Sequence, residues 1–97
     1  MAYQIEFDPS VREHFEYLTA RERAWVMDEI HRQLTHQPLV RTRNRKPLRP
    51  NARATWALRV GDLRVFYDVV DSERVRVLAV GRKRGNMVII GGREMTS

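Results

Sequence analysis

The sequence predicts an α+β domain in which two helices cover one face of an antiparallel sheet. An alternating strand pattern opens the chain, and two helical patterns follow it. From residue 54 onward the apolar residues return to a spacing of two, which predicts a meander of three to four strands. Because helices and sheets each bury one face, this order favours helices packed on one side of the sheet. A chain of 97 residues is expected to form one domain, residues 1–97.

The N-terminal elements are each marked by a local signal. Residues 3–7 alternate and predict a short strand. Asp8 as N-cap and Pro9 in the first turn predict the start of a short helix. Its apolar residues recur at helical spacing: Val11, Phe15 and Leu18.

A second helix is expected to begin at Thr19, because Glu22 three residues later completes the pattern of a capping box. The helix is expected to end before Pro38. Its apolar stripe consists of Ala24, Met27, Ile30 and Leu34, widened by Trp25 and Val26.

Residues 37–53 predict a solvated basic loop, because they contain three prolines, six basic side chains and no acid. Strands are expected at about 54–60, 63–70 and 74–82, and a short last strand at 87–90. Tight turns at Gly61-Asp62 and Asp71-Ser72 connect the first three of these strands.

Composition excludes several classes of protein. No apolar run approaches the roughly 18 residues of a membrane span, and the first residues lack the basic and apolar regions of a signal peptide. The chain has no cysteine, which excludes disulfides and thiolate metal sites. No acidic triplet or histidine pair suggests another metal site, so no metal and no cofactor are expected. A cytoplasmic protein without a membrane partner is the expectation.

Positive charge is concentrated in the second half of the chain. Residues 1–40 carry four basic against seven acidic side chains, a net charge of −3, whereas residues 41–97 carry fourteen against five, a net +9. Nearly all the basic residues are arginine, the side chain suited to forked phosphate contacts. This asymmetry predicts a basic face and makes nucleic acid the first candidate partner.

The strand arginines are expected to line that basic face. Along residues 63–70 the side chains alternate between two faces. One face carries Leu63, Val65 and Tyr67, and the other carries Arg64, Phe66 and Asp68. Because an unpaired buried guanidinium is costly, we expect Arg64 and the run Arg82-Lys83-Arg84 to lie together on the wet face, away from the helices.

Two motifs follow one another in the second half of the chain: Leu58-Arg59-Val60-Gly61-Asp62-Leu63-Arg64-Val65-Phe66-Tyr67 and Val80-Gly81-Arg82-Lys83-Arg84. In these motifs and in its order of elements, the chain resembles the RelE/ParE superfamily of bacterial type II toxin–antitoxin toxins. The resemblance implies a RelE-like fold, a cognate antitoxin as partner, and contact with operator DNA only through the antitoxin.

The resemblance also implies the leading function, a ribosome-dependent mRNA endoribonuclease that inhibits translation. In that reading Arg64 acts on the scissile phosphate, and Arg82, with Lys83 or Arg84, supplies the second cation after Val-Gly. The catalytic candidates are therefore Arg64, Arg82 and Lys83. The RNA-binding candidates are Lys46, Arg49, Arg53, Arg59 and Arg84.

The acid–base groups of the RNA-cleaving members are not matched residue by residue. Thr55 and Ala57 stand where those members place lysines, and Ile89 stands near the position of their tyrosine. Lys46, Arg49 and Arg53 are candidates to replace the lysines in space.

Other acid–base candidates are few. Asp68 lies on the Arg64 face and is expected either to orient the guanidinium or to act as a base. Tyr67 and Trp56 are expected in the core. The three histidines are expected away from the arginine face: His14, His31 and His36.

Two other functions stay open. One is a ParE-like poison of DNA gyrase or a non-catalytic binding protein, which the thin acid–base inventory favours. The other is a decayed toxin retained in an autoregulatory complex. The basic loop likewise has three readings: solvated surface, a contact for nucleic-acid phosphates, or a surface for an acidic antitoxin segment.

Overall fold

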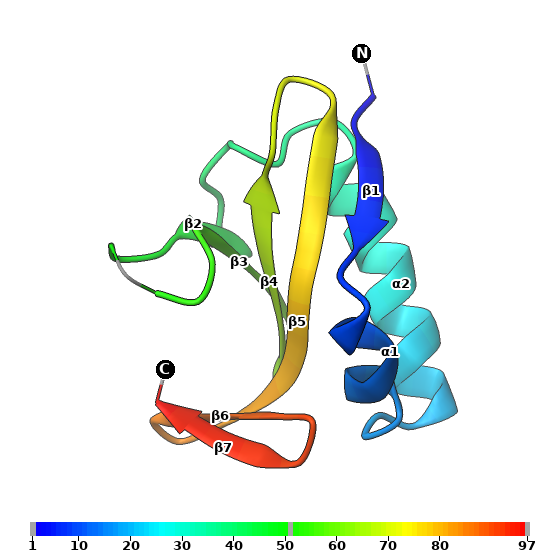
Figure 1. Ribbon diagram of the computed structural model, residues 1–97, viewed down its shortest axis with the longest axis vertical. Helices are drawn as coiled ribbons and strands as arrows, with labels where there is room; N and C mark the ends of the chain where they lie inside the picture. The colour runs from blue at the N-terminus through cyan, green and yellow to red at the C-terminus, as the bar shows by residue number, and fades with distance from the viewer. Residues whose placement is uncertain (1, 51, 97) are drawn as a thin grey trace.

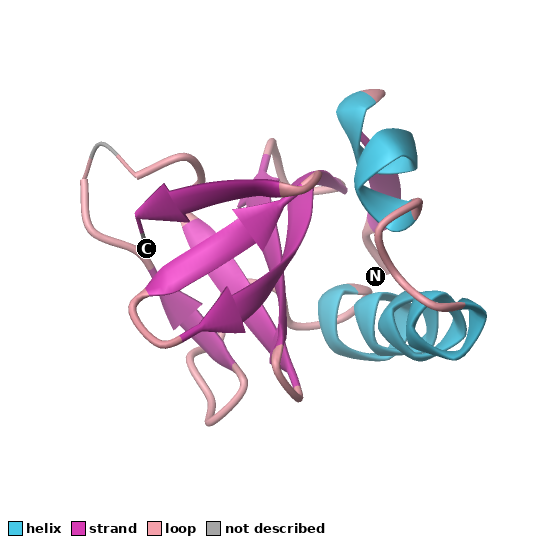
Figure 2. Cartoon of the chain, turned by 90° about the horizontal axis from the view of Figure 1, so that it is seen from below, coloured by secondary structure: helices cyan, strands magenta, loops and turns pink. Residues whose placement is uncertain are grey.

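In the computed structural model, which describes residues 2–50 and 52–96, two helices lie on one side of a seven-stranded sheet (Figures 1 and 2). The strand order is β2-β3-β4-β5-β6-β7, and β1 pairs in parallel with β5. The elements are β1 (Gln4–Phe7), α1 (Ser10–Phe15), α2 (Ala20–Leu34), β2 (Arg45–Pro47), β3 (Trp56–Val60), β4 (Leu63–Val69), β5 (Arg74–Arg84), β6 (Met87–Ile90) and β7 (Arg93–Thr96).

The α+β class and the order of strand, two helices and antiparallel meander are confirmed, and the sheet is larger than expected. The expectation of a loop is wrong for residues 45–47, which form β2 on the edge of the sheet beside β3. Asn51, also within the expected loop, lies outside the described residues. Residues 93–96 add β7, which returns after Gly91-Gly92 and pairs with β6.

Both helices begin close to where their capping signals predict. Asp8 accepts a hydrogen bond from the backbone N–H of Ser10 at 3.1 Å, so its carboxylate holds the first turn of α1, although the helix itself starts at Ser10. At α2 the capping box is complete: Thr19 Oγ1 accepts from the Glu22 N–H, and Glu22 Oε1 accepts from the Thr19 N–H. The helix ends at Leu34.

The main core lies between the helices and the sheet. Val26, Ile30 and Leu34 of α2 pack against fully buried residues of β3, β4 and β5. Those residues are Leu58, Val60, Leu63, Val65, Tyr67, Val75, Val77 and Val80. The alternation predicted for β4 is confirmed, because Leu63, Val65 and Tyr67 are buried on this side.

A β-bulge interrupts the regular alternation of β5. Phe66 pairs with Ala79 while Tyr67 pairs with Val77, which leaves Leu78 as the extra residue. Val77 and Val80 therefore both face the main core, whereas Ala79 joins the small cluster on the opposite face. Every residue of β5 after Leu78 points to the other side from the one that uninterrupted alternation predicts.

Among the described residues, no helix is both long enough and apolar enough to span a membrane.

Candidate functional site

A basic cavity of about 460 Å³ opens on the face of the sheet that the helices leave uncovered. Its lining comes from β2 and the segment that follows it, from β3, β4 and β5, and from the C-terminal hairpin β6–β7 (elements labelled in Figure 1). Five cationic side chains line it: Lys46, Arg49, Arg53, Arg64 and Lys83. Apolar side chains line the rest, including Phe66, Val88, Ile90 and Met95. None of the described lining residues is acidic.

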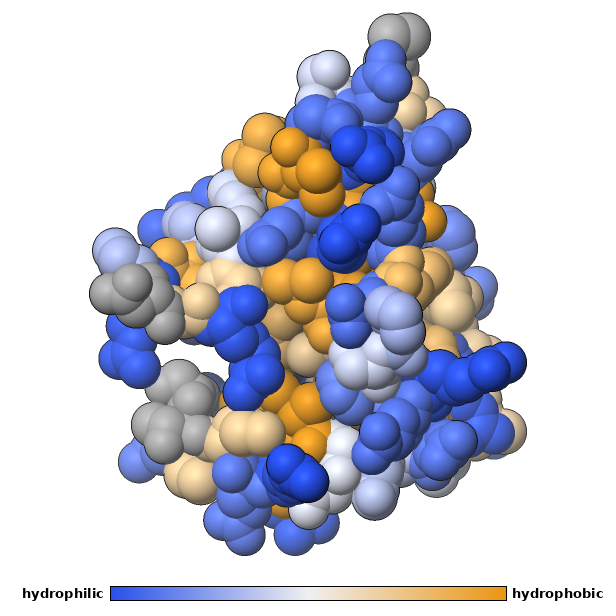
Figure 3. Space-filling model, in the orientation of Figure 1, coloured by the Kyte–Doolittle hydropathy of each residue, from blue (hydrophilic) through white to orange (hydrophobic). Residues whose placement is uncertain are grey.

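The basic cavity combines the two surfaces that a nucleotide needs. Cationic groups attract the phosphates, and an apolar floor accepts a base. The space-filling view shows hydrophilic side chains dominating one face of the molecule, with apolar atoms visible between them (Figure 3). The small side chain of Ala57 on β3 lines the floor, and Ala79 of β5 packs beside Phe66.

Arg64 lies on β4, in the middle of this face. Its Nη1 donates to the carbonyl oxygens of Gly61 and Leu63, at 2.8 Å each, so the turn between β3 and β4 holds the guanidinium. Burial, reinforced by the neighbouring Arg59, lowers the pKa of Arg64 from its ordinary value. A guanidinium nevertheless stays charged in proteins, so this site favours an anion.

Lys46 reaches the cavity because β2 is anchored from its other side. Arg45 is buried, and its guanidinium donates to the carbonyl oxygens of Gln33 and Val40 at 2.7 and 3.0 Å. Since neighbouring strand residues point to opposite faces, anchoring Arg45 toward α2 directs Lys46 to the open face. Lys46 pairs with Ala57, another residue that lines the cavity.

The expectation that Arg82 shares a face with Arg64 is wrong. Arg82 pairs across the sheet with Leu63 of the main core, whereas Arg64 pairs with Gly81. The guanidinium of Arg82 donates to Glu22 Oε1 at 2.8 Å and to Asp62 Oδ2 at 3.1 Å. It therefore joins the N-terminus of α2 to the turn between β3 and β4.

This ion-pair network shifts the pKa values of both Glu22 and Arg82. The hydrogen bond from Arg82, together with the capping bond from Thr19, lowers the pKa of Glu22 from 4.5 to about 2. The same Glu22 hydrogen bond raises the pKa of Arg82.

Lys83, and neither arginine of the Arg82-Lys83-Arg84 run, lines the cavity with Arg64. Arg84 lies on the side of Arg82, where both line a smaller cavity of about 180 Å³ with His14 and Tyr17. The bulge at Leu78 is the physical reason, because it reverses the facing of residues 79–84. Arg59 is exposed beside Arg64, its cross-strand partner, outside the cavity lining.

Comparisons with known proteins identify the family. A family model described as the ParE toxin of the type II toxin–antitoxin system, parDE, matches residues 5–87. This chain belongs to that toxin family. The toxin is also similar in structure to a chain of the toxin–antitoxin complex RelBE2 from Mycobacterium tuberculosis. The TM-score is 0.70 and the identity 28%, over 86% of the toxin and 100% of that chain. No curated protein matches the toxin.

These findings confirm the resemblance to the RelE/ParE superfamily and the RelE-like fold. Both the ParE and the RelBE names occur among the matches, so family membership alone does not distinguish a gyrase poison from a ribonuclease.

The remaining acid–base candidates lie outside the basic cavity. Asp68 accepts hydrogen bonds from the N–H and the hydroxyl of Thr55, at 2.7 and 2.8 Å, so it fixes the start of β3 rather than Arg64. Tyr67 is fully buried and donates to the Pro38 carbonyl at 2.7 Å, and burial raises its pKa. Trp56 stacks on Tyr67 at a centroid distance of 6.3 Å.

No histidine is among the described residues that line the basic cavity. His14 accepts a hydrogen bond from the Val80 N–H through Nδ1 at 3.3 Å, on the helix side of the sheet. Its pKa is lowered, mainly because it is partly buried. His31 and His36 are exposed on α2 and just after it.

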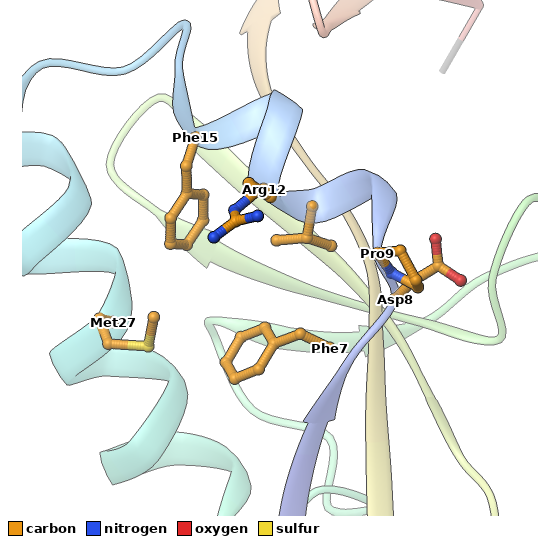
Figure 4. A pocket seen from close by; sticks show the side chains of 7 residues that line it. Phe7, Asp8, Pro9, Arg12, Phe15 and Met27 are labelled. Atoms are coloured by element: carbon orange, nitrogen blue, oxygen red, sulfur yellow. The ribbon is translucent and has the colours of Figure 1, made fainter.

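A third cavity, of about 360 Å³, lies on the helix side of the toxin. Phe7, Phe15 and Met27 face into it from β1, α1 and α2, with Asp8 and Arg12 at its edge (Figure 4). This cavity is mainly apolar, so it offers a contact surface and lacks the cation cluster of the open face.

Two features of the site could not be read from the sequence: the apolar floor of the cavity, and the strand β2 that carries Lys46. Met95 was beyond the last expected strand, and β2 was hidden in a segment dominated by proline and arginine. No sequence signal marked β2, because a three-residue strand with a polar sequence is too short for periodicity to reveal.

Proposed function

We propose that this toxin is a ribosome-dependent mRNA endoribonuclease that inhibits translation. The observation that carries the proposal is the basic cavity, in which Arg64 stands among four further cations above an apolar floor. Single-stranded RNA presents this combination of charged backbone and unstacked base to a protein.

The chemistry requires no metal. The 2′-hydroxyl of one nucleotide attacks the adjacent phosphorus, and negative charge grows on the phosphorane oxygens. We propose that Arg64 and Lys83 stabilise that charge, and that Phe66 and Met95, which line the same cavity, form an apolar floor for a base. We propose that flanking phosphates contact Arg49, Arg53 and Arg59. The proposed reaction centre does not include Arg82 or Arg84, which line the other cavity.

The partners follow from the proposed function and the family. We propose that a cognate antitoxin neutralises the toxin in the cytoplasm, because the similar M. tuberculosis structure is a toxin–antitoxin complex. Binding to operator DNA would then proceed only through the antitoxin.

A second function, poisoning of DNA gyrase, is favoured by a specific observation. The matching family model is described as ParE, and no histidine, tyrosine or carboxylate is among the described residues that line the basic cavity. A non-enzymatic toxin would need the cations but no histidine, tyrosine or carboxylate beside them.

Induced expression of the toxin without its antitoxin tests the proposal. Primer extension on an abundant transcript, within minutes of induction, is expected to show cuts that disappear when translation of that transcript is blocked. Growth arrest with intact transcripts, double-strand DNA breaks and an SOS response would reject the ribonuclease in favour of the gyrase poison.

A further inference from the structure

The basic cavity contains two side chains that can exchange a proton. Arginine stays protonated in proteins, whereas lysine can give up a proton and take it back. The sequence has two lysines, Lys46 and Lys83, and both line the basic cavity although they are 37 positions apart. Any proton transfer by a side chain of the described cavity lining therefore involves one of these lysines.

The two lysines lie on opposite sides of Arg64. In the strand order β2-β3-β4-β5, Lys46 belongs to β2, Arg64 to β4 and Lys83 to β5. Lys83 is one strand from Arg64, so both cations can contact oxygens of the same phosphate. Lys46 starts two strands away from Arg64 and two residues further along the strand direction, about 12 Å in all, so its side chain must reach beyond β3 to approach that phosphate from the other side.

Ala57 leaves space for this reach. Lys46 pairs with Ala57, and Ala57 pairs with Phe66 on the next strand, so the three residues form one row across the open face. Directly opposite residues of antiparallel strands project to the same side, about 5 Å apart. The short side chain of Ala57 lets the Lys46 ammonium pass over β3 toward the edge of Phe66 and Arg64.

The backbone beneath Lys46 is held firmly. Arg45 is bonded to Gln33 and Val40, the Thr42 N–H donates to the Arg45 carbonyl at 2.9 Å, and the Leu48 N–H donates to the Thr55 carbonyl at 2.8 Å. These bonds fix the backbone from which the exposed Lys46 side chain reaches into the cavity, and a fixed starting point favours the precise placement that general acid catalysis needs.

We propose that Lys46 is the general acid of the toxin, an inference that rests on the proposed ribonuclease function. The 2′-hydroxyl loses its proton to water, the 2′-oxygen bonds to phosphorus, and the bond from phosphorus to the 5′-oxygen breaks. The Lys46 ammonium gives a proton to that 5′-oxygen and regains one from water. The products are a 2′,3′-cyclic phosphate and a free 5′-hydroxyl, with no net consumption of water or metal.

The test compares Lys46→Arg with the wild type in a reconstituted translation system. Arginine keeps the positive charge and cannot donate a proton readily, so cleavage is expected to slow by about 10²–10⁴-fold. Binding of a non-cleavable 2′-O-methyl message on the ribosome is expected to stay within about twofold. Arg43→Lys, an exposed exchange in the same segment and outside the cavity lining, is the matched control and should cleave at the wild-type rate.

A message with sulfur in place of the 5′-oxygen at the cleaved bond separates proton donation from other roles. A thiolate leaves without protonation, so Lys46→Arg is expected to cleave this message as fast as the wild type does. Cleavage of ordinary message by Lys46→Arg at the wild-type rate, or sulfur rescue of Lys83→Arg instead, would overturn the assignment of Lys46. An inactive wild type would instead reject the ribonuclease itself.

Discussion

Arg64 is held from one side by the carbonyl oxygens of Gly61 and Leu63, and it faces an open cavity on the other. A guanidinium fixed in this way is preorganised, so it can stabilise charge that develops on a phosphate without first rearranging. The positive charge of its neighbour Arg59 repels the Arg64 guanidinium, and an anion bound beside both guanidinium groups would relieve this repulsion.

Replacing Arg64 by alanine is expected to abolish growth arrest, with cleavage slowed by about 10²–10³-fold, because the preorganised cation is lost. The fold should persist, since removal of a cation beside Arg59 also removes repulsion. Growth after induction, a thermal melt and antitoxin pull-down together measure these effects. Normal toxicity of a well-expressed, folded Arg64→Ala toxin would contradict the assignment.

Between elements, the turn that joins β3 to β4 connects the helices to the site. Asp62 in this turn accepts a bond from Arg82, which also binds Glu22 at the start of α2. Trp25 of α2 covers Gly61, whose carbonyl holds Arg64. The N-terminal turns of one helix thereby position a side chain on the far face of the sheet.

The bond between Glu22 and Arg82 predicts a pH dependence of stability. The folded pKa of Glu22, about 2, lies below the ordinary 4.5, so the folded state binds this proton less readily than the unfolded state. The stabilisation is complete above pH 4.5 and is lost as the pH falls toward 2, by about 1–3 kcal/mol. Urea unfolding from pH 6 to pH 2 should show a smaller loss in Glu22→Gln, and the wild-type loss in the exposed control Glu16→Gln.

The contact between the Gly61 turn and Trp25 can be tested by comparing Gly61→Ala with Gly85→Ala as its control. Gly61 and Gly85 have similar φ angles, +60° and +56°, and alanine at either position costs about 1–2 kcal/mol of backbone strain. A Cβ at Gly61 would also lie 2.6 Å from Trp25, whereas a Cβ at Gly85 meets nothing within 4 Å. Gly61→Ala should therefore be the less stable in urea, with altered tryptophan fluorescence and weaker toxicity. Equal unfolding free energies for the two variants would argue against the Trp25 contact.

Across the whole molecule, the fold separates two surfaces of different chemistry. The helices and the apolar cavity beside α1 lie on one side of the sheet, and the basic cavity opens on the other. A chain with a net charge of +6 thereby gathers five cationic side chains around one cavity, the surface proposed above to contact RNA.

Salt should weaken RNA binding in proportion to the cations that contact phosphate. For single-stranded RNA the logarithm of the affinity falls with the logarithm of salt concentration, with a slope of about −0.7 per phosphate neutralised. Arg53→Gln is expected to reduce the slope by about 0.7, whereas Arg21→Gln, exposed on α2, should leave it unchanged. Binding of 2′-O-methyl RNA between 50 and 300 mM salt, followed by fluorescence anisotropy, measures both slopes; equal slopes would place Arg53 outside the interface.

The sequence by itself determined features that depend only on residues near one another in the chain, namely a helix start and the buried side of a strand. The capping box at Thr19 and Glu22 marked the start of α2, and alternation along 63–69 marked which side of β4 is buried. These signals require only neighbours in the chain, because a cap binds within one turn and a strand alternates by its own geometry. The placement of Arg64 on the open face followed from the same alternation.

Only the tertiary structure decided which cations accompany Arg64. The bulge at Leu78 inserts one residue into β5, so Lys83 enters the cavity while Arg82 turns toward Glu22. Lys46 enters because Arg45 is bonded to Gln33, twelve residues away in the chain. Bulges and long-range anchors arise from pairing between strands and helices, and that pairing leaves no period in the sequence.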